Sequence, residues 1–168
     1  LQWFVKNISI GFMKDKDLLT YSRHIMLPEI DIEGQRKISS AKVAIIGLGG
    51  LGCSASIFLA SSGVGELCLV DDDVIDLSNL QRQILFSESD VDKGKILAAK
   101  ESLSSLNKDI KLIAQNLKIT ASNIDKTLNK FDYVLDCTDN FDTRKIVNSY
   151  CFKTKKILIS GSSQGWKG

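Results

Sequence analysis

Short apolar segments alternate with longer amphipathic segments along most of the chain. The apolar segments have four to six residues, which suits buried strands, and the segments between them have helical spacing. We predict strands at 43–47, 66–71, 110–115, 133–137 and 157–160, and helices near 50–62, 93–107, 122–130 and 141–153. Apolar strands that alternate with helices are typical of a parallel sheet covered on both faces. The pattern predicts an α/β, Rossmann-like fold with a mostly parallel sheet.

The segments before and after this alternating pattern indicate where the domain begins and ends. We expect an N-terminal helical extension, with one helix over Asp17–Leu27 that ends at Pro28 and a shorter one over Gly34–Ser40. The first methionine is Met13, so we expect residues 1–13 to be a non-native or disordered leader and residues 14–168 to form one domain. Because little sequence follows the last predicted strand, we expect that domain to be incomplete at its C-terminus.

Composition narrows the class of protein. The 168 residues are 43% hydrophobic and 25% charged with one proline, which is ordinary for a globular α/β domain and excludes a disordered or fibrous chain. The net charge is +2 and the lysines are scattered, so we expect no nucleic-acid partner. No signal peptide or membrane span can be assembled, and we expect a cytoplasmic protein that binds no membrane.

The four cysteines are Cys53, Cys68, Cys137 and Cys151, and none of them forms a C-x-x-C pair. We interpret them as reduced core thiols, which agrees with a cytoplasmic location and predicts no zinc ligands in this chain. Cys137 falls in a predicted strand, so we expect it in the core.

A glycine-rich turn, Gly47-Leu48-Gly49-Gly50-Leu51-Gly52, follows the first predicted strand and opens a helix. This context matches the G-x-G-x-x-G fingerprint of nucleotide sites. Gly47 permits the tight turn, Gly49 lets backbone N–H groups approach phosphate, and Gly52 allows close packing of helix on strand. The N-terminus of the helix can then hold anionic oxygen.

Asp71 ends the second predicted strand, where an acid in this fold accepts hydrogen bonds from ribose hydroxyls. Asp71 could bind the ribose of NAD or of ATP equally well. The neighbouring Asp72 and Asp73 would repel a 2′-phosphate, which disfavours NADP. The alternative is that all three are solvated turn carboxylates.

Two cations and one carboxylate favour ATP chemistry over hydride transfer. ATP chemistry needs cations on the phosphates and a carboxylate for Mg²⁺, and Arg82, Lys95 and Asp139 offer both. Asp139 follows the fourth predicted strand, at the sheet edge where open α/β sheets bind ligands. Taken alone, Asp139 or Asn140 would be a helix cap; the combination with Arg82 and Lys95 favours the metal role for Asp139.

Several of these motifs carry a resemblance to a known family. The sequence GLGGLG at 47–52, Asp71, SNLQRQ at 78–83 and DCTDN at 136–140 are similar to the adenylating domain of the ThiF/MoeB/HesA family, bacterial relatives of ubiquitin-activating enzymes. Tyr21-Ser22-Arg23-His24-Ile25 resembles the opening helix of that family. The resemblance runs from about Leu18 to Ser160.

The resemblance implies an adenylyltransferase that binds ATP and Mg²⁺. It implies transfer of AMP to the C-terminal glycine carboxylate of a ubiquitin-like sulfur carrier ending in Gly-Gly, with release of pyrophosphate, in molybdopterin or thiamine biosynthesis. It also implies a homodimer in which Arg23 reaches the phosphates of the neighbouring subunit. The nucleotide-binding residues that it implies are Gly47, Gly49, Gly50, Gly52, Asp71, Ser78, Asn79, Arg82, Lys95, Asp139 and Asn140. Arg82, Asp139 and Arg23 would be catalytic, with Mg²⁺ on Asp139.

Two further features of the family have no match here. Members usually continue with a loop that bears a cysteine for sulfur or thioester transfer, and many carry two C-x-x-C pairs that bind zinc. We therefore assign no catalytic cysteine, expect zinc only in a longer protein, and expect the fragment to be inactive by itself. An NAD-dependent oxidoreductase and a non-catalytic, truncated relative remain the alternatives.

Overall fold

The computed structural model describes residues 13–163. These residues form two compact units that divide between Lys37 and Ile38. The leader expected at residues 1–13 lies outside the described residues, except for Met13 itself.

The first unit holds three helices: α1 (Asp15–Thr20), α2 (Ser22–Ile25) and most of α3 (Asp31–Ser40). The single helix expected over residues 17–27 is therefore wrong, because the chain turns at Tyr21, where ψ is 17°. The Tyr21 ring stacks on His24, and His24 Nδ1 hydrogen-bonds to Gln35 Oε1 at 2.9 Å. A tertiary contact between α2 and α3 thus accompanies the break.

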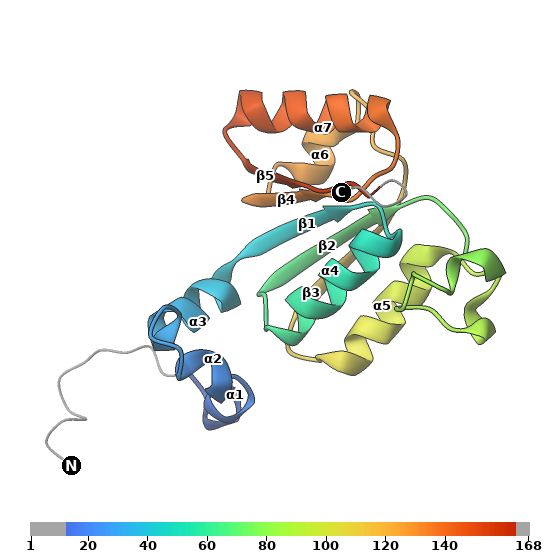
Figure 1. The fold of residues 1–168 in the computed structure, drawn as a ribbon. Coiled ribbons are helices and arrows are strands. Elements are labelled where there is room, and N and C mark those ends of the chain that lie inside the picture. Colours follow the sequence, from blue (N-terminus) through green and yellow to red (C-terminus); the bar gives the residue numbers. More distant parts are fainter. Residues whose placement is uncertain (1–12, 164–168) are drawn as a thin grey trace, which may run out of the picture. The chain divides into compact units, whose positions relative to one another are not determined.

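The second unit contains a five-stranded sheet in the order β3-β2-β1-β4-β5. Every neighbouring pair is parallel, so the predicted Rossmann-like fold is confirmed, with a fully parallel sheet (Figure 1). The strands are β1 (Lys42–Ile46), β2 (Glu66–Asp71), β3 (Lys111–Asn116), β4 (Tyr133–Asp136) and β5 (Ile157–Ser160).

Helices cover both faces of this sheet, as predicted. Val43 and Ile45 of β1 pack into one core cluster with residues of α4 (Gly50–Ser61) and α5 (Lys95–Leu106). Ala44 and Ile46 point to the opposite face and pack with α6 (Ile124–Leu128) and α7 (Phe141–Thr154). Figure 1 shows these two pairs of helices on opposite sides of the strands. Among residues 13–163, no helix is both long and apolar enough to cross a bilayer.

The cysteines follow the prediction with one exception. All four are free thiols, and Cys53, Cys68 and Cys151 are buried. Cys137 is only partly buried, because β4 ends at Asp136 and Cys137 begins the turn beyond it. Its expected place inside a strand is therefore wrong, although its side chain still packs against the core cluster under α4 and α5.

Candidate functional site

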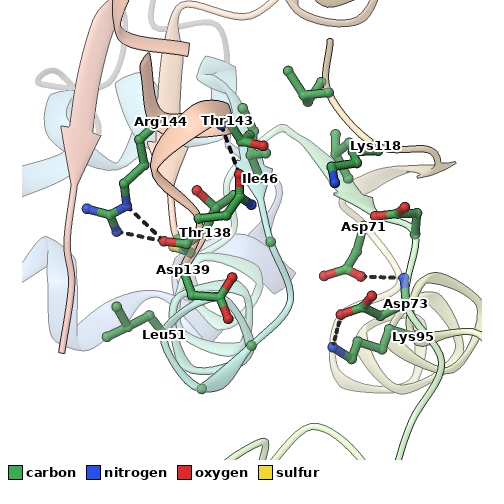
Figure 2. A pocket seen from close by; sticks show the side chains of 18 of the residues that line it. Ile46, Leu51, Asp71, Asp73, Lys95, Lys118, Thr138, Asp139, Thr143 and Arg144 are labelled. Carbon is green, nitrogen blue, oxygen red and sulfur yellow. Dashed lines mark hydrogen bonds and ion pairs between the residues drawn. The ribbon is translucent and has the colours of Figure 1, made fainter. Parts of the chain in front are cut away.

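The strand order reverses at β1, which lies between β2 and β4. In an open parallel sheet, the connections on the two sides of such a reversal diverge and leave a crevice at the carboxyl ends of the strands. A cleft of about 1590 Å³ lies at this edge, lined by the ends of β1 and β2 and by the segments that follow β1, β2, β3 and β4 (Figure 2).

The glycine turn after β1 forms one wall of the cleft. Gly47 has a φ of +90°, and a Cβ there would lie 3.0 Å from the carbonyl oxygen of Cys137. Gly52 packs more tightly still, since its Cβ would lie 1.9 Å from the carbonyl oxygen of Gly47. Glycine at these two positions lets the turn fold back onto the first turn of α4.

The N-terminus of α4 opens onto the cleft without a capping side chain. Its N-cap is Gly49, which lines the cleft and has nothing within 4 Å of the position that a Cβ would take. Gly50 also lines the cleft, and the stem of Arg82 passes 3.4 Å from its Cβ position. The first N–H groups of a helix have no intrahelical partner and carry partial positive charge. This end of α4 can therefore bind an anion, with the Arg82 side chain beside it.

Asp71 joins the end of β2 to the glycine turn. Its Oδ2 accepts a hydrogen bond from the Leu48 N–H at 2.6 Å, and its Oδ1 accepts one from the Asp73 N–H at 2.8 Å. Asp71 is therefore not a solvated turn carboxylate, in contrast to the exposed Asp72 and Asp73. A carboxylate has about four acceptor sites, so Asp71 retains capacity for hydroxyl groups in the cleft.

Lys95 is a buried cation in the wall of the cleft, with 5% of its surface exposed. Its Nζ lies 2.9 Å from Asp73 Oδ2. Lys95 is also the first residue of α5, where the helix dipole disfavours positive charge. The structure thus places a buried cation, paired with one exposed carboxylate, in the wall of the cleft.

The segment from Asp76 to Arg82 forms a compact turn that presents Arg82 to the cleft. Asp76 Oδ1 accepts from the Ser78 N–H at 2.7 Å, and Asn79 Oδ1 accepts from the Asp76 N–H at 3.1 Å. Arg82 Nη1 donates to the Ser78 carbonyl oxygen at 3.3 Å. Since these bonds use the Asn79 oxygen, its amide nitrogen is the group left to donate to a ligand.

Three polar residues at the end of β4 and just beyond it make different contacts. Asp136 is 2% exposed, and its Oδ1 accepts from the Thr138 hydroxyl at 2.7 Å. Asn140 is the helix cap, because its Oδ1 accepts from the Thr143 N–H at 2.9 Å. Asp139 is exposed, lines the cleft, and makes no hydrogen bond or ion pair within residues 13–163. The capping alternative for Asp139 is thereby removed, and its carboxylate is available to a cation.

Asp139 faces the acidic residues and Lys95 from the other side of the cleft (Figure 2). The carboxylate oxygens of Asp71, Asp72 and Asp73 lie within 4.8 Å of one another and form a second group with metal-ligating chemistry. Asp71 already accepts two N–H groups and Asp73 already pairs with Lys95. Asp139 has neither commitment, so it remains the better candidate for a metal ligand.

Two further cations line the cleft that the sequence motifs did not predict. Arg144 donates to the Thr138 carbonyl oxygen through Nε at 2.9 Å and Nη2 at 2.7 Å, and also to the carbonyl oxygen of Gly161. It thus ties the loop that carries Asp139 to the segment after β5. Lys118 follows β3 and lines the cleft as well (Figure 2). The sequence offered one indication of these two residues. Both follow predicted strands, which places them at the carboxyl edge of the sheet.

Burial disfavours the thiolate form of Cys137, the thiol that lines the cleft. Burial, assisted by the negative charge of Asp136, raises the pKa of Cys137 from 9.0 to about 11. Burial raises the pKa of Cys53, below the glycine turn, to about 12. Thiols react as thiolates, so the raised pKa lowers the reactivity of both side chains.

The cleft brings together most of the residues that the sequence singled out. Gly52 and Ser78 do not line it but hold the turns that do, and Arg23 is exposed on α2 in the first unit. The roles of all these residues in binding and catalysis stay predictions. The predicted residues that line the cleft are Gly47, Gly49, Gly50, Asp71, Asn79, Arg82, Lys95, Asp139 and Asn140.

Comparison with known proteins agrees with this geometry. The chain is 45% identical over 156 residues to the sulfur carrier protein ThiS adenylyltransferase of Escherichia coli (93% of this chain, 62% of the relative). It is 40% identical over 156 residues to the molybdopterin-synthase adenylyltransferase of the same organism (93% and 63%). The structure is similar to that of E. coli MccB with ATP, with a TM-score of 0.77, 34% identity and coverage of 85% of this chain and 44% of that chain.

The chain therefore spans about three fifths of the length of these two curated relatives. A sequence profile of the ThiF family matches residues 21–168, which include the glycine turn, Lys95 and the loop of Asp139. The match covers most of the chain and both walls of the cleft. On these grounds, and in agreement with the resemblance of its motifs, the chain belongs to the ThiF family.

Proposed function

We propose that this chain is the adenylating domain of an enzyme that activates a ubiquitin-like sulfur-carrier protein. The enzyme transfers AMP from ATP to the C-terminal glycine carboxylate of the carrier and releases pyrophosphate. The names of two relatives support this reaction type, since one is a ThiS adenylyltransferase and the other a molybdopterin-synthase adenylyltransferase. The carrier is of the thiamine or the molybdopterin type, depending on which of these two relatives has the same substrate as this protein.

One observation carries the proposal. An uncapped helix N-terminus at Gly49, two cationic side chains and an uncommitted carboxylate converge on a single cleft. Arg82 and Lys95 are the cations, and Asp139 is the carboxylate. A dinucleotide needs the glycine turn and Asp71, but it does not need this additional set of charges around the phosphates.

The charges suit attack of a carboxylate on the α-phosphorus of ATP. A bond forms between a carboxylate oxygen of the carrier and phosphorus, the bond to the bridging oxygen breaks, and its electron pair leaves with pyrophosphate. Both reactants are anionic, so neutralisation and in-line positioning supply most of the catalysis. The N–H groups of α4, Arg82 and Lys95 would neutralise the phosphates, and Asp71 would accept from the ribose hydroxyls.

The residues also fit a bound Mg²⁺. Asp139 offers an oxygen ligand that no other described residue occupies, which is the ligand type that Mg²⁺ prefers. Mg²⁺ held there would supply further charge neutralisation on the phosphates. We further propose a homodimer in which Arg23 completes the phosphate site of the neighbouring subunit, an addition that can change rates by about 10³–10⁵ in related phosphoryl-transfer systems.

The test is ATP–pyrophosphate exchange by the native full-length protein, supplied with a carrier that ends in Gly-Gly. We expect exchange that depends on Mg²⁺ and is absent with a carrier lacking the two terminal glycines. Arg82→Ala should abolish exchange, whereas Gln81→Ala, at an exposed neighbour outside the cleft, should not. Tight binding of NAD without binding of ATP·Mg²⁺ would instead favour the oxidoreductase.

A further inference from the structure

Gln83 is a buried polar residue of the cleft wall to which no role has been given. Only 3% of its surface is exposed, and it lines the cleft. Its backbone is firmly placed, because its N–H donates to the Asn79 carbonyl oxygen at 2.9 Å. Gln83 therefore belongs to the same compact turn that presents Arg82.

The side-chain oxygen of Gln83 has no hydrogen-bond donor. Gln83 Oε1 is the one fully buried side-chain polar atom among the described residues that lacks a partner. Burying an amide oxygen without a donor is costly, and nearly all buried polar groups in native proteins are paired. An unpaired acceptor in the wall of a ligand cleft is explained if the ligand brings the donor.

We propose that Gln83 binds the nucleotide, with Oε1 accepting a hydrogen bond from a donor that arrives with ATP·Mg²⁺. This inference rests on the function proposed above. Phosphate oxygens at neutral pH only accept, so the donor is a ribose hydroxyl, the amino group of adenine or a water bound to the metal. In each case the acceptor is satisfied in the complex and unsatisfied without it.

The inference predicts that stability and affinity change in different directions when the oxygen is removed. Gln83→Met keeps the length of the side chain and lacks the amide. Without nucleotide, we expect its melting temperature to equal or exceed that of the wild type, because an unpaired buried acceptor is lost. Its Kd for ATP·Mg²⁺ should rise by about three- to tenfold, the range expected for one hydrogen bond.

Gln81→Met is the matched control. Gln81 lies two residues earlier in the same turn but is exposed and does not line the cleft. It should leave the Kd unchanged. Calorimetric titration of the native full-length protein measures all three Kd values, and thermal unfolding without ligand measures the three melting temperatures.

Altered ligands identify the donor. We would repeat the titrations with 2′-deoxy-ATP, with 3′-deoxy-ATP, with the triphosphate of purine riboside, which lacks the amino group, and with ATP without Mg²⁺. The ligand for which Gln83→Met no longer weakens binding is the one that lacks the donor. A penalty that persists with all four counts against the proposal, because each donor named above is missing from one of these ligands.

Two further results would overturn this inference while leaving the proposed function intact. One is wild-type binding of ATP·Mg²⁺ with an unchanged Kd for Gln83→Met; the other is a melting temperature several degrees lower without nucleotide, which would mean that the oxygen already has a partner. If Gln83→Met does not fold, the test is the NMR signal of the Gln83 side-chain amide in the wild-type protein. If that signal does not shift on nucleotide binding, the result counts against the proposal. Failure of the wild type to bind ATP·Mg²⁺ would overturn the proposed function and this inference with it.

Discussion

The ammonium of Lys95 lies 2.9 Å from the carboxylate of Asp73, yet the two side chains differ sharply in exposure, at 7% and 67%. Solvent already stabilises Asp73, whereas Lys95 is shielded from solvent beside this counter-charge and lies at the unfavourable end of α5. The pair is therefore asymmetric. The charge of Lys95 is stabilised mainly by Asp73, whereas the charge of Asp73 is stabilised mainly by solvent.

This asymmetry predicts different effects for the two partners. Lys95→Met replaces a buried charge by an apolar chain of similar length, so we expect the free energy of unfolding to change by less than about 1 kcal/mol. Its affinity for ATP·Mg²⁺ should fall at least about tenfold, the equivalent of 1.4 kcal/mol. Urea unfolding and calorimetric titration measure the two effects.

Asp73→Asn is the companion variant. It leaves Lys95 buried without a full counter-charge, so we expect a loss of about 1–2 kcal/mol, less than for a fully buried pair because Asp73 is mostly exposed. ATP should restore part of this loss by supplying negative charge to Lys95. Equal destabilisation by Lys95→Met and Asp73→Asn would contradict this asymmetry.

Substitutions at Asp139 and Asn140 should have different effects, one on activity with Mg²⁺ and ATP and the other on the free energy of unfolding. Asn140 caps α7, so Asn140→Ala should lower the free energy of unfolding by about 1 kcal/mol. Asp139 makes no bond within the described residues, so Asp139→Asn should change it by less than about 0.5 kcal/mol. We expect Asp139→Asn, in contrast, to abolish Mg²⁺-dependent ATP–pyrophosphate exchange. Normal exchange by that variant would remove Asp139 from the metal site.

The glycine turn offers a second matched pair. A Cβ at Gly52 would lie 1.9 Å from the Gly47 carbonyl oxygen, so Gly52→Ala must displace backbone and should cost about 1–3 kcal/mol. At Gly49 the same methyl group meets nothing within 4 Å, and Gly49→Ala should leave stability within about 0.5 kcal/mol of the wild type. The methyl group of Gly49→Ala enters the cleft, so this variant should bind ATP more weakly than the wild type does. A large loss of stability with Gly49→Ala would show that the turn is more constrained than its contacts indicate.

The buried thiols predict a loss of stability at alkaline pH. Burial raises the pKa of Cys68, in β2, from 9.0 to about 12. Because the folded pKa exceeds the unfolded one, the stabilisation is complete below pH 9 and is lost as the pH rises from 9 toward 12. Urea unfolding between about pH 7 and 10.5 should show a decline that is smaller in Cys68→Ala. Parallel pH profiles for the two proteins would exclude Cys68 as a contributor.

Local sequence determined most of the secondary structure. The strands at Glu66–Asp71 and Ile157–Ser160 have the predicted bounds, because a buried parallel strand requires a continuous apolar run that is visible in the sequence itself. The break at Tyr21 was not visible, since neither glycine nor proline marks it. It coincides with the stacking of Tyr21 on His24 and with the bond from His24 to Gln35, eleven residues away.

What the sequence by itself determined is the set of chemical groups. Glycines spaced for a turn, an acid after a strand, and the motifs SNLQRQ and DCTDN are properties of residue type and order. They were sufficient to predict the family, which the profile match confirms.

Only the tertiary structure decided which of these groups are free to act. Asp71 bonds to Leu48, 23 residues earlier, and Lys95 pairs with Asp73, 22 residues earlier. Asn140 rather than Asp139 caps α7, and Gln83 is left with an unpaired oxygen. These outcomes depend on distances between segments that meet only when the strands pair at their carboxyl ends. No local pattern records such distances, because hydrogen bonding and burial are set by whatever the fold brings within about 3 Å.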